Sequence, residues 1–123
     1  MDWRLELVAV PVTDVDRATA FYVEQVGFHA DHDHRVNDAL RFVQLTPPGS
    51  ACSIMLDTNM TEMPPGSQKG LVVVVEDIEA ARRKLIGHGV EVSEVDFQPW
   101  GSFVTFIDPD GNTWALQQLP SRK

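Results

Sequence analysis

A short segment of this chain occurs twice, and the repeat constrains the fold more than any other feature. Val12–Asp16 (VTDVD) matches Val75–Glu79 (VEDIE), 63 positions later. At the same offset, apolar residues follow at helical spacing in both copies. They are Val15, Ala18 and Tyr22 in the first copy and Ile78, Ala81 and Leu85 in the second. Such self-similarity indicates two copies of one structural unit.

Each copy begins with an apolar segment that predicts a strand. Leu5–Val12 and Leu71–Val75 are rich in valine and too short for a helix. Asp14 or Asp77 follows, placed to cap the N-terminus of the next helix. Three more strands are expected after each helix, because strand-like segments alternate there with turn residues. These strands are His29–Val36, Leu40–Leu45 and Ala51–Asp57 in the first copy, and Val90–Phe97, Phe103–Ile107 and Thr113–Leu119 in the second.

The sequence therefore predicts an α+β fold made of two βαβββ modules. We expect one domain over residues 1–123, with modules at about 3–58 and about 69–119 and a linker at 59–68. A unit of about sixty residues buries too little surface alone, so the modules should pack together into a concave mixed-sheet cleft with helices outside. By strand alternation, Leu5, Leu7, Ala9 and Pro11 should face the cleft, with Val8, Val10 and Val12 under the helices.

With these motifs the sequence resembles the vicinal-oxygen-chelate superfamily, which includes glyoxalase I, extradiol dioxygenases, fosfomycin-resistance enzymes and bleomycin-resistance proteins. The resemblance covers nearly the whole chain. It is carried by Val12–Asp14 leading into Ala18, Phe21 and Tyr22, by Val26–Phe28, by Val75–Asp77 and by Asp108–Asn112. It implies the glyoxalase/bleomycin-resistance fold and a homodimer that completes its cleft with a neighbouring chain.

Enzymes of this superfamily usually hold a divalent metal with His, Gln or Glu side chains from four strands. The resemblance places these positions at Leu7, Gly70, near Ser53, and at Ala115. A register shift of two would substitute Met55 or Asp57 and Gln117. A catalytic divalent ion generally needs three or more protein ligands, so we expect no metal and no other cofactor.

The expected cleft has an apolar and aromatic wall with a few polar groups, which suits a ligand pocket. The candidate ligand-binding residues are Leu7, Ala9, His32, Arg41, Ser53, Met55, Trp100, Phe103 and Gln117, with Gln44 as the alternative to Arg41. Trp100 could stack on a ligand or lie in the core. His29, His32 and His34 could chelate a metal, but an exposed polar strand is the favoured interpretation.

The best interpretation is a metal-free protein that binds a hydrophobic or aromatic natural product by sequestration, as in bleomycin resistance. The alternative is a lyase, isomerase or dioxygenase-like enzyme, with unconventional metal ligands or with a histidine or Asp57 as acid/base. A third possibility is an accessory module without a ligand. No catalytic residue is assigned.

The charge balance excludes some partners. The 18 acidic and 10 basic residues give a net charge of −8, which disfavours nucleic acid and anionic membranes and would favour a cationic ligand. Cys52 is the only cysteine, so no intrachain disulfide can form. The sequence has no signal-peptide pattern and no long apolar segment, so we expect a cytoplasmic protein.

Overall fold

The computed structural model describes residues 2–37, 40–58 and 61–120, and it confirms the α+β fold. The first copy contains β1 (Leu7–Pro11), α1 (Val15–Ala20), the π-helix η1 (Phe21–Val26), β2 (His29–Asn37), β3 (Leu40–Thr46) and β4 (Ser53–Asp57). The second contains β5 (Leu71–Val74), α2 (Ile78–Gly87), β6 (Asp96–Gln98), β7 (Gly101–Ile107) and β8 (Thr113–Gln118). We call β1–β4 with α1 and η1 the first module, and β5–β8 with α2 the second module.

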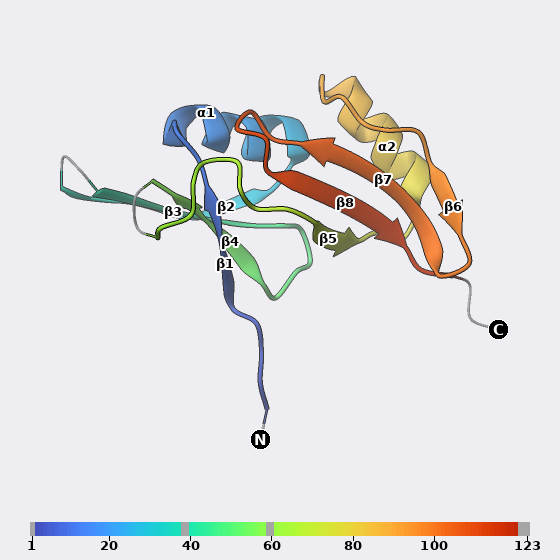
Figure 1. The fold of residues 1–123 in the computed structure, drawn as a ribbon, viewed down its shortest axis with the longest axis horizontal. Helices are drawn as coiled ribbons and strands as arrows, with labels where there is room; N and C mark the ends of the chain where they lie inside the picture. The colour runs from blue at the N-terminus through green and yellow to red at the C-terminus, as the bar shows by residue number, and fades with distance from the viewer. Residues whose placement is uncertain (1, 38–39, 59–60, 121–123) are drawn as a thin grey trace.

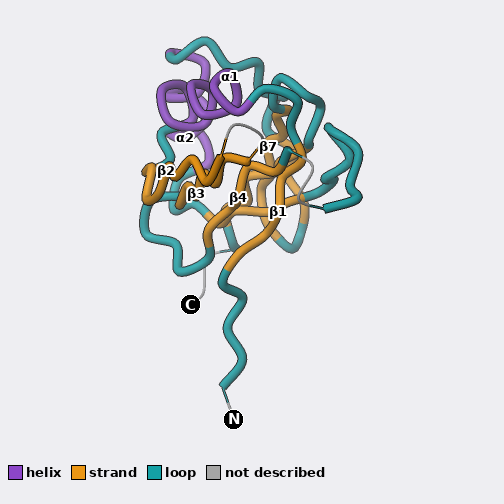
Figure 2. Tube along the Cα trace, turned by 90° about the vertical axis from the view of Figure 1, so that its left-hand side faces the viewer, coloured by secondary structure: helices purple, strands orange, loops and turns teal. Residues whose placement is uncertain are grey.

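The two modules have the same strand topology. The strand orders are β1-β4-β3-β2 and β5-β8-β7-β6, each with one parallel pair, β1 with β4 and β5 with β8. The sheets lie next to each other with the helices on one side (Figures 1 and 2). We call the opposite side of each sheet its outward face. The repeat seen in the sequence is thus a repeat of topology.

The predicted helix caps are present in both modules. Asp14 accepts a hydrogen bond from the Arg17 backbone N–H at 3.1 Å, and Asp77 accepts one from Ala80 at 3.0 Å. Each cap satisfies an amide that the first helical turn would leave without a partner. The aspartates therefore begin the helices where the sequence placed them.

Two predicted strands are shorter than expected. Residues 2–6 form an extended arm that points away from the sheets (Figures 1 and 2), and Leu5 is exposed instead of facing a cleft. The paired register of β1 with β4 begins at Leu7 opposite Ser53, which is the first residue of β4, and the Glu6 carbonyl accepts the last backbone hydrogen bond, from Ser53 N–H at 2.9 Å. Residues 90–95 also lie outside β6, because the Ser93 hydroxyl accepts the Thr105 N–H at 2.9 Å in place of a backbone carbonyl.

The core lies between the sheets and the helices, and both modules contribute to it. An aromatic cluster joins them: the Tyr22 ring lies 5.6 Å from Phe28 and 5.7 Å from Trp114, which in turn stacks on Phe106. Val10 and Val12 are buried here as predicted, and Trp114 is a core residue. The two modules therefore share one core, and neither is packed alone.

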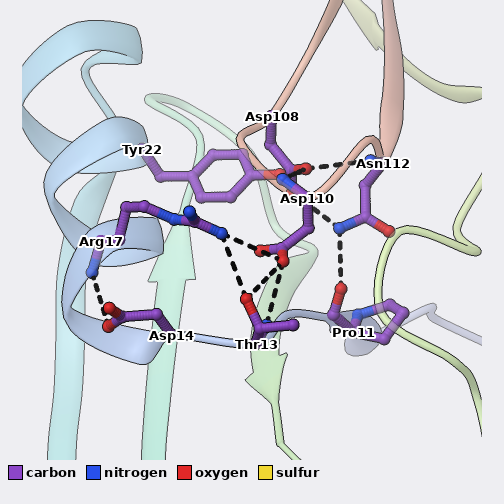
Figure 3. Close-up of polar contacts among 8 residues, drawn as sticks. All are labelled: Pro11, Thr13, Asp14, Arg17, Tyr22, Asp108, Asp110 and Asn112. Carbon is purple, nitrogen blue, oxygen red and sulfur yellow. Dashed lines mark hydrogen bonds and ion pairs between the residues drawn. The ribbon is translucent and has the colours of Figure 1, made fainter.

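A buried polar network also joins the modules (Figure 3). The Asp108 carboxylate accepts hydrogen bonds from the Tyr22 hydroxyl and the Asn112 side-chain amide, both at 2.7 Å. Asn112 also donates to the Pro11 carbonyl at the end of β1, at 2.8 Å. Burial, together with the negative charge of Asp108, raises the pKa of Tyr22 well above its usual range, so the phenol keeps its proton and donates. The turn of the second module is thereby fixed to β1 and η1 of the first.

Candidate ligand-binding site

The outward face of the second sheet is apolar and open. Trp114 and Leu116 of β8 lie in the core, so Thr113, Ala115 and Gln117 alternate onto the outward face. On the neighbouring strand β5, Val72 and Val74 are 54% and 57% exposed. Exposed aliphatic side chains that gather on one sheet face are a common mark of a binding surface.

An open pocket of about 880 Å³ lies at the end of the second sheet and includes part of this face. Its lining combines outward-facing residues of the sheet with residues of the helix side and of the segment after α2. The outward-facing residues are Gly70, Thr105, Ile107, Thr113 and Ala115; the others are Ile86, Val90, Glu91, Val92, Ser93, Phe106 and Trp114. The segment after α2 reaches the pocket because it runs beside β7, with the Ser93 N–H bonded to the Thr105 carbonyl at 3.0 Å. The pocket is large enough for a drug-sized ligand.

The pocket exists where the second module has small residues. Val72 lies opposite Ala115 on the neighbouring strand, just as its repeat equivalent Ala9 lies opposite Met55. Met55 is only 8% exposed and fills the first outward face, whereas alanine leaves space in the second. Likewise Gly70 corresponds to Leu7, and a Cβ added at Gly70 would meet nothing within 4 Å.

The residues at the four superfamily ligand positions do not fit a divalent metal. Leu7, Gly70 and Ala115 have no donor atom in their side chains, and the Ser53 hydroxyl is hydrogen-bonded to Thr46 at 2.6 Å. Within residues 2–37, 40–58 and 61–120, no group of three or more His, Cys, Asp or Glu side chains is arranged to hold a metal ion. His29, His32 and His34 accordingly form no metal-ligand group on β2.

The structure brings most candidate residues of the first module onto one face. Leu7 lies opposite Ser53 and Ala9 opposite Met55, all on the outward side. Met55 in turn lies opposite Gln44, which pairs with the exposed His32.

Arg41 does not lie on this face. It shares the strand alternation of Val43 and Leu45, which point into the core, and it is hydrogen-bonded to Asp33 at 2.7 and 2.8 Å and to Asp16 of α1. Hydrogen bonds from the guanidinium lower the pKa of Asp33. Gln44, the alternative to Arg41, lies on the outward face, opposite Met55.

The candidate residues of the second module lie together at the end of the face away from the pocket. Phe103 lies opposite Gln117, and the Gln117 side chain donates to the Trp100 carbonyl at 3.2 Å. Trp100 is 62% exposed, so it is outside the core. The outward face therefore runs from the pocket past Ala115 and Gln117 to the turn that carries the exposed Trp100.

The pocket residues Glu91, Thr105, Ile107 and Thr113 were missed by sequence reasoning. From the sequence, Gly70 is identified only as a position where a metal ligand is missing, and Ala115 is identified both as such a position and as part of the cleft wall. Gly70 and Ala115 are small where the first copy of the repeat has the larger Leu7 and Met55. Smaller side chains at matching positions leave unfilled volume, and this signal was present in the sequence.

Comparisons with known proteins agree with this fold. The family model for the Glyoxalase/Bleomycin resistance protein/Dioxygenase superfamily matches residues 4–116, and the chain belongs to this superfamily. TnmS3, an antibiotic binding protein from Streptomyces sp. CB03234, is 37% identical with a TM-score of 0.88, over 97% of this chain and 98% of that one. A glyoxalase/bleomycin resistance protein from the same Streptomyces is 38% identical with a TM-score of 0.84, over 94% and 100%. The uncharacterized protein YetH of Bacillus subtilis (strain 168) is 32% identical, over 90% of this chain and 94% of its own length.

No helix in the described part of the chain is long and apolar enough to cross a membrane.

Proposed function

We propose that this protein binds a hydrophobic or aromatic small molecule on the outward face of the second sheet and sequesters it without a metal. The observation that carries the proposal is the open pocket beside Gly70 and Ala115, where enzymes of the superfamily would place metal ligands. In this chain the same positions offer space and apolar contact instead of donor atoms. A planar ligand could extend from the pocket along Ala115 towards Trp100 and stack on the indole.

The similarity to TnmS3 supports this proposal, because that protein is an antibiotic binding protein and matches this chain over nearly its whole length. The charge of the pocket indicates which ligands are disfavoured. Glu91 is the only ionisable residue among those that line the pocket in the described structure, and the chain has a net charge of −8. Both features disfavour an anionic ligand. We therefore expect a neutral or cationic molecule.

We also propose that two chains form a homodimer that completes the binding cleft. Val72, Val74 and Ile107 leave more than half of their surface exposed on one face, and the arm carries Trp3 at 88% and Leu5 at 70% exposure. Apolar surface of this extent is favourable to cover in a homodimer. Sedimentation velocity should give the dimer mass, and a monomer at high micromolar concentration would contradict this part of the proposal.

Equilibrium dialysis with a panel of planar aromatic compounds tests the binding function. We expect saturable binding of one ligand per chain, and Trp100→Ala should weaken it about 5- to 10-fold through loss of stacking. Phe97→Ala is the matched control, because Phe97 is 71% exposed on the same β6–β7 hairpin but lies opposite Ser102, on the helix side. It should leave the affinity unchanged.

Two results would count against the proposal. Failure of the whole panel to bind would remove the ligand-binding function. Conversion of a bound compound into a product would instead support the enzymatic alternative.

A further inference from the structure

We infer that Thr113 determines ligand specificity in this pocket by donating a hydrogen bond to a neutral acceptor oxygen, such as a carbonyl, on an otherwise apolar ring system. The inference rests on the proposed ligand-binding function and makes it more specific. It follows from the hydrogen bonds of the hydroxyl groups on the two outward faces.

The Thr113 hydroxyl is held in place with its proton free. Its oxygen accepts the Gly70 backbone N–H at 2.7 Å, and the Thr113 backbone N–H donates to the Gln68 carbonyl at 2.9 Å. A hydroxyl has one proton and two acceptor lone pairs, so a bond accepted from Gly70 leaves the proton to point elsewhere. No acceptor for it is found among the residues that the structure describes. A fixed donor on the pocket wall costs little further ordering when a ligand binds.

Two other hydroxyls near the sheets are already engaged. Ser93 donates to the Glu94 carbonyl at 3.0 Å and accepts from Thr105 N–H at 2.9 Å. Ser53 is the counterpart of Thr113 in the first module, because it lies opposite Leu7 as Thr113 lies beside Gly70. The Ser53 hydroxyl is hydrogen-bonded to Thr46, and Ser53 is only 4% exposed. Thr113 differs from Ser53 because it lines the open pocket, and from Ser93 because its proton is not donated to a neighbouring carbonyl. The Thr105 hydroxyl also lines the pocket, but no hydrogen bond among the described residues holds it in place.

The surroundings of Thr113 limit what the acceptor can be. Ile107, its partner on β7, is 59% exposed, and Ala115 follows on the same face, so the nearby walls are apolar. A ligand oxygen that loses water in such surroundings needs a replacement donor. A carboxylate or phosphate would meet the negative charge of Glu91, which leaves a neutral oxygen as the acceptor that fits.

Fluorene and 9-fluorenone test this inference, because the two flat molecules differ only in a methylene group against a carbonyl group. Equilibrium dialysis gives both dissociation constants for wild type, Thr113→Val and Thr113→Ser. Wild type should prefer fluorenone about 3- to 10-fold, the usual value of one net hydrogen bond. Thr113→Val keeps the shape and should abolish the preference, whereas Thr113→Ser keeps the hydroxyl and should retain it.

Thr113→Val also removes the acceptor for Gly70, so its fluorene affinity serves as the check that the pocket is intact. If Thr113→Val does not fold, the infrared carbonyl stretch of fluorenone bound to wild type shows whether the ligand carbonyl accepts a hydrogen bond. A shift to lower wavenumber than in an alkane solvent is expected for a hydrogen-bonded carbonyl.

The outcomes separate this inference from the proposed function. Equal binding of the two probes, a preference that survives in Thr113→Val, or an unshifted carbonyl stretch would overturn the role of Thr113 and leave ligand binding standing. Failure of wild type to bind either probe would overturn the pocket itself, and with it the proposed function.

Discussion

The two modules share one topology but differ on their outward faces. In the first, Met55 fills the face and Ser53 is buried and hydrogen-bonded. In the second, Ala115 and Gly70 leave a pocket of about 880 Å³. The helix-facing sides of both sheets are packed with core side chains. We infer that the stability of the fold depends on this packing in both modules. The outward faces were free to diverge, and this difference is the reason that the proposed function places the ligand on the second module.

The largest expected effect concerns the network that holds the two modules in one arrangement. Asp108→Ala should lower the free energy of unfolding by about 3 kcal/mol, because Tyr22 and Asn112 would keep buried donors without an acceptor. Urea denaturation measures this. The exposed carboxylate Glu76, changed to alanine, should cost almost nothing. A loss below about 1 kcal/mol for Asp108→Ala would show that the modules are joined mainly by apolar packing.

Truncation on the two outward faces should have unequal costs. Met55→Ala removes a side chain that is 8% exposed and should cost about 2 kcal/mol, at the lower end for a buried methionine. Val72→Ala, opposite Ala115 in the second module, should cost less than about 0.5 kcal/mol because Val72 is 54% exposed. Equal losses in thermal or urea unfolding would remove the distinction between a filled and an open face.

Much of the fold could be predicted from the sequence because it depends on local signals. The repeated apolar strands and the capping aspartates Asp14 and Asp77 determine where elements begin, and both caps are present. Strand ends were less predictable, since they depend on partners distant in sequence. Residues 90–95 read as a strand, but the Ser93 side chain interrupts the backbone ladder there.

The site was predicted less completely than the fold. Alternation placed Leu7, Ser53, Phe103 and Gln117 correctly on the outward faces. The choice of Arg41 over Gln44 was wrong, because Arg41 alternates with the core residues Val43 and Leu45 onto the helix side, where it forms ion pairs with Asp16 and Asp33. The pocket was missed because a cavity is created by absent side chains, and residue-by-residue reasoning looks for chemistry that is present.

The smallest expected effect concerns charge. Arg41 pairs with two carboxylates in the first module, whereas Arg82 of the second donates to the neutral Ser93 carbonyl at 2.9 Å. Asp33→Asn should cost about 0.5 kcal/mol at neutral pH, because Asp33 is 46% exposed.

The pH dependence of this pair has a definite sign. The pKa of Asp33 is lowered in the folded state, so its contribution is present above the usual value of 3.8 and is lost as the pH falls below it. Unfolding curves of wild type and Asp33→Asn should therefore converge in acid. A difference that persists there would mean that packing, and not charge, is responsible.

Ala115→Met tests the central claim most directly, because it gives the second module the residue that fills the first. We expect the dissociation constant for 9-fluorenone to rise at least about 10-fold, since the side chain would occupy the pocket, while the unfolding free energy changes by less than about 0.5 kcal/mol. Ala80→Met is the matched control, the same substitution at an exposed position of α2 outside the pocket lining, and should bind as wild type does. A folded Ala115→Met variant with wild-type affinity would contradict the assignment of ligand binding to the hollow of the second module.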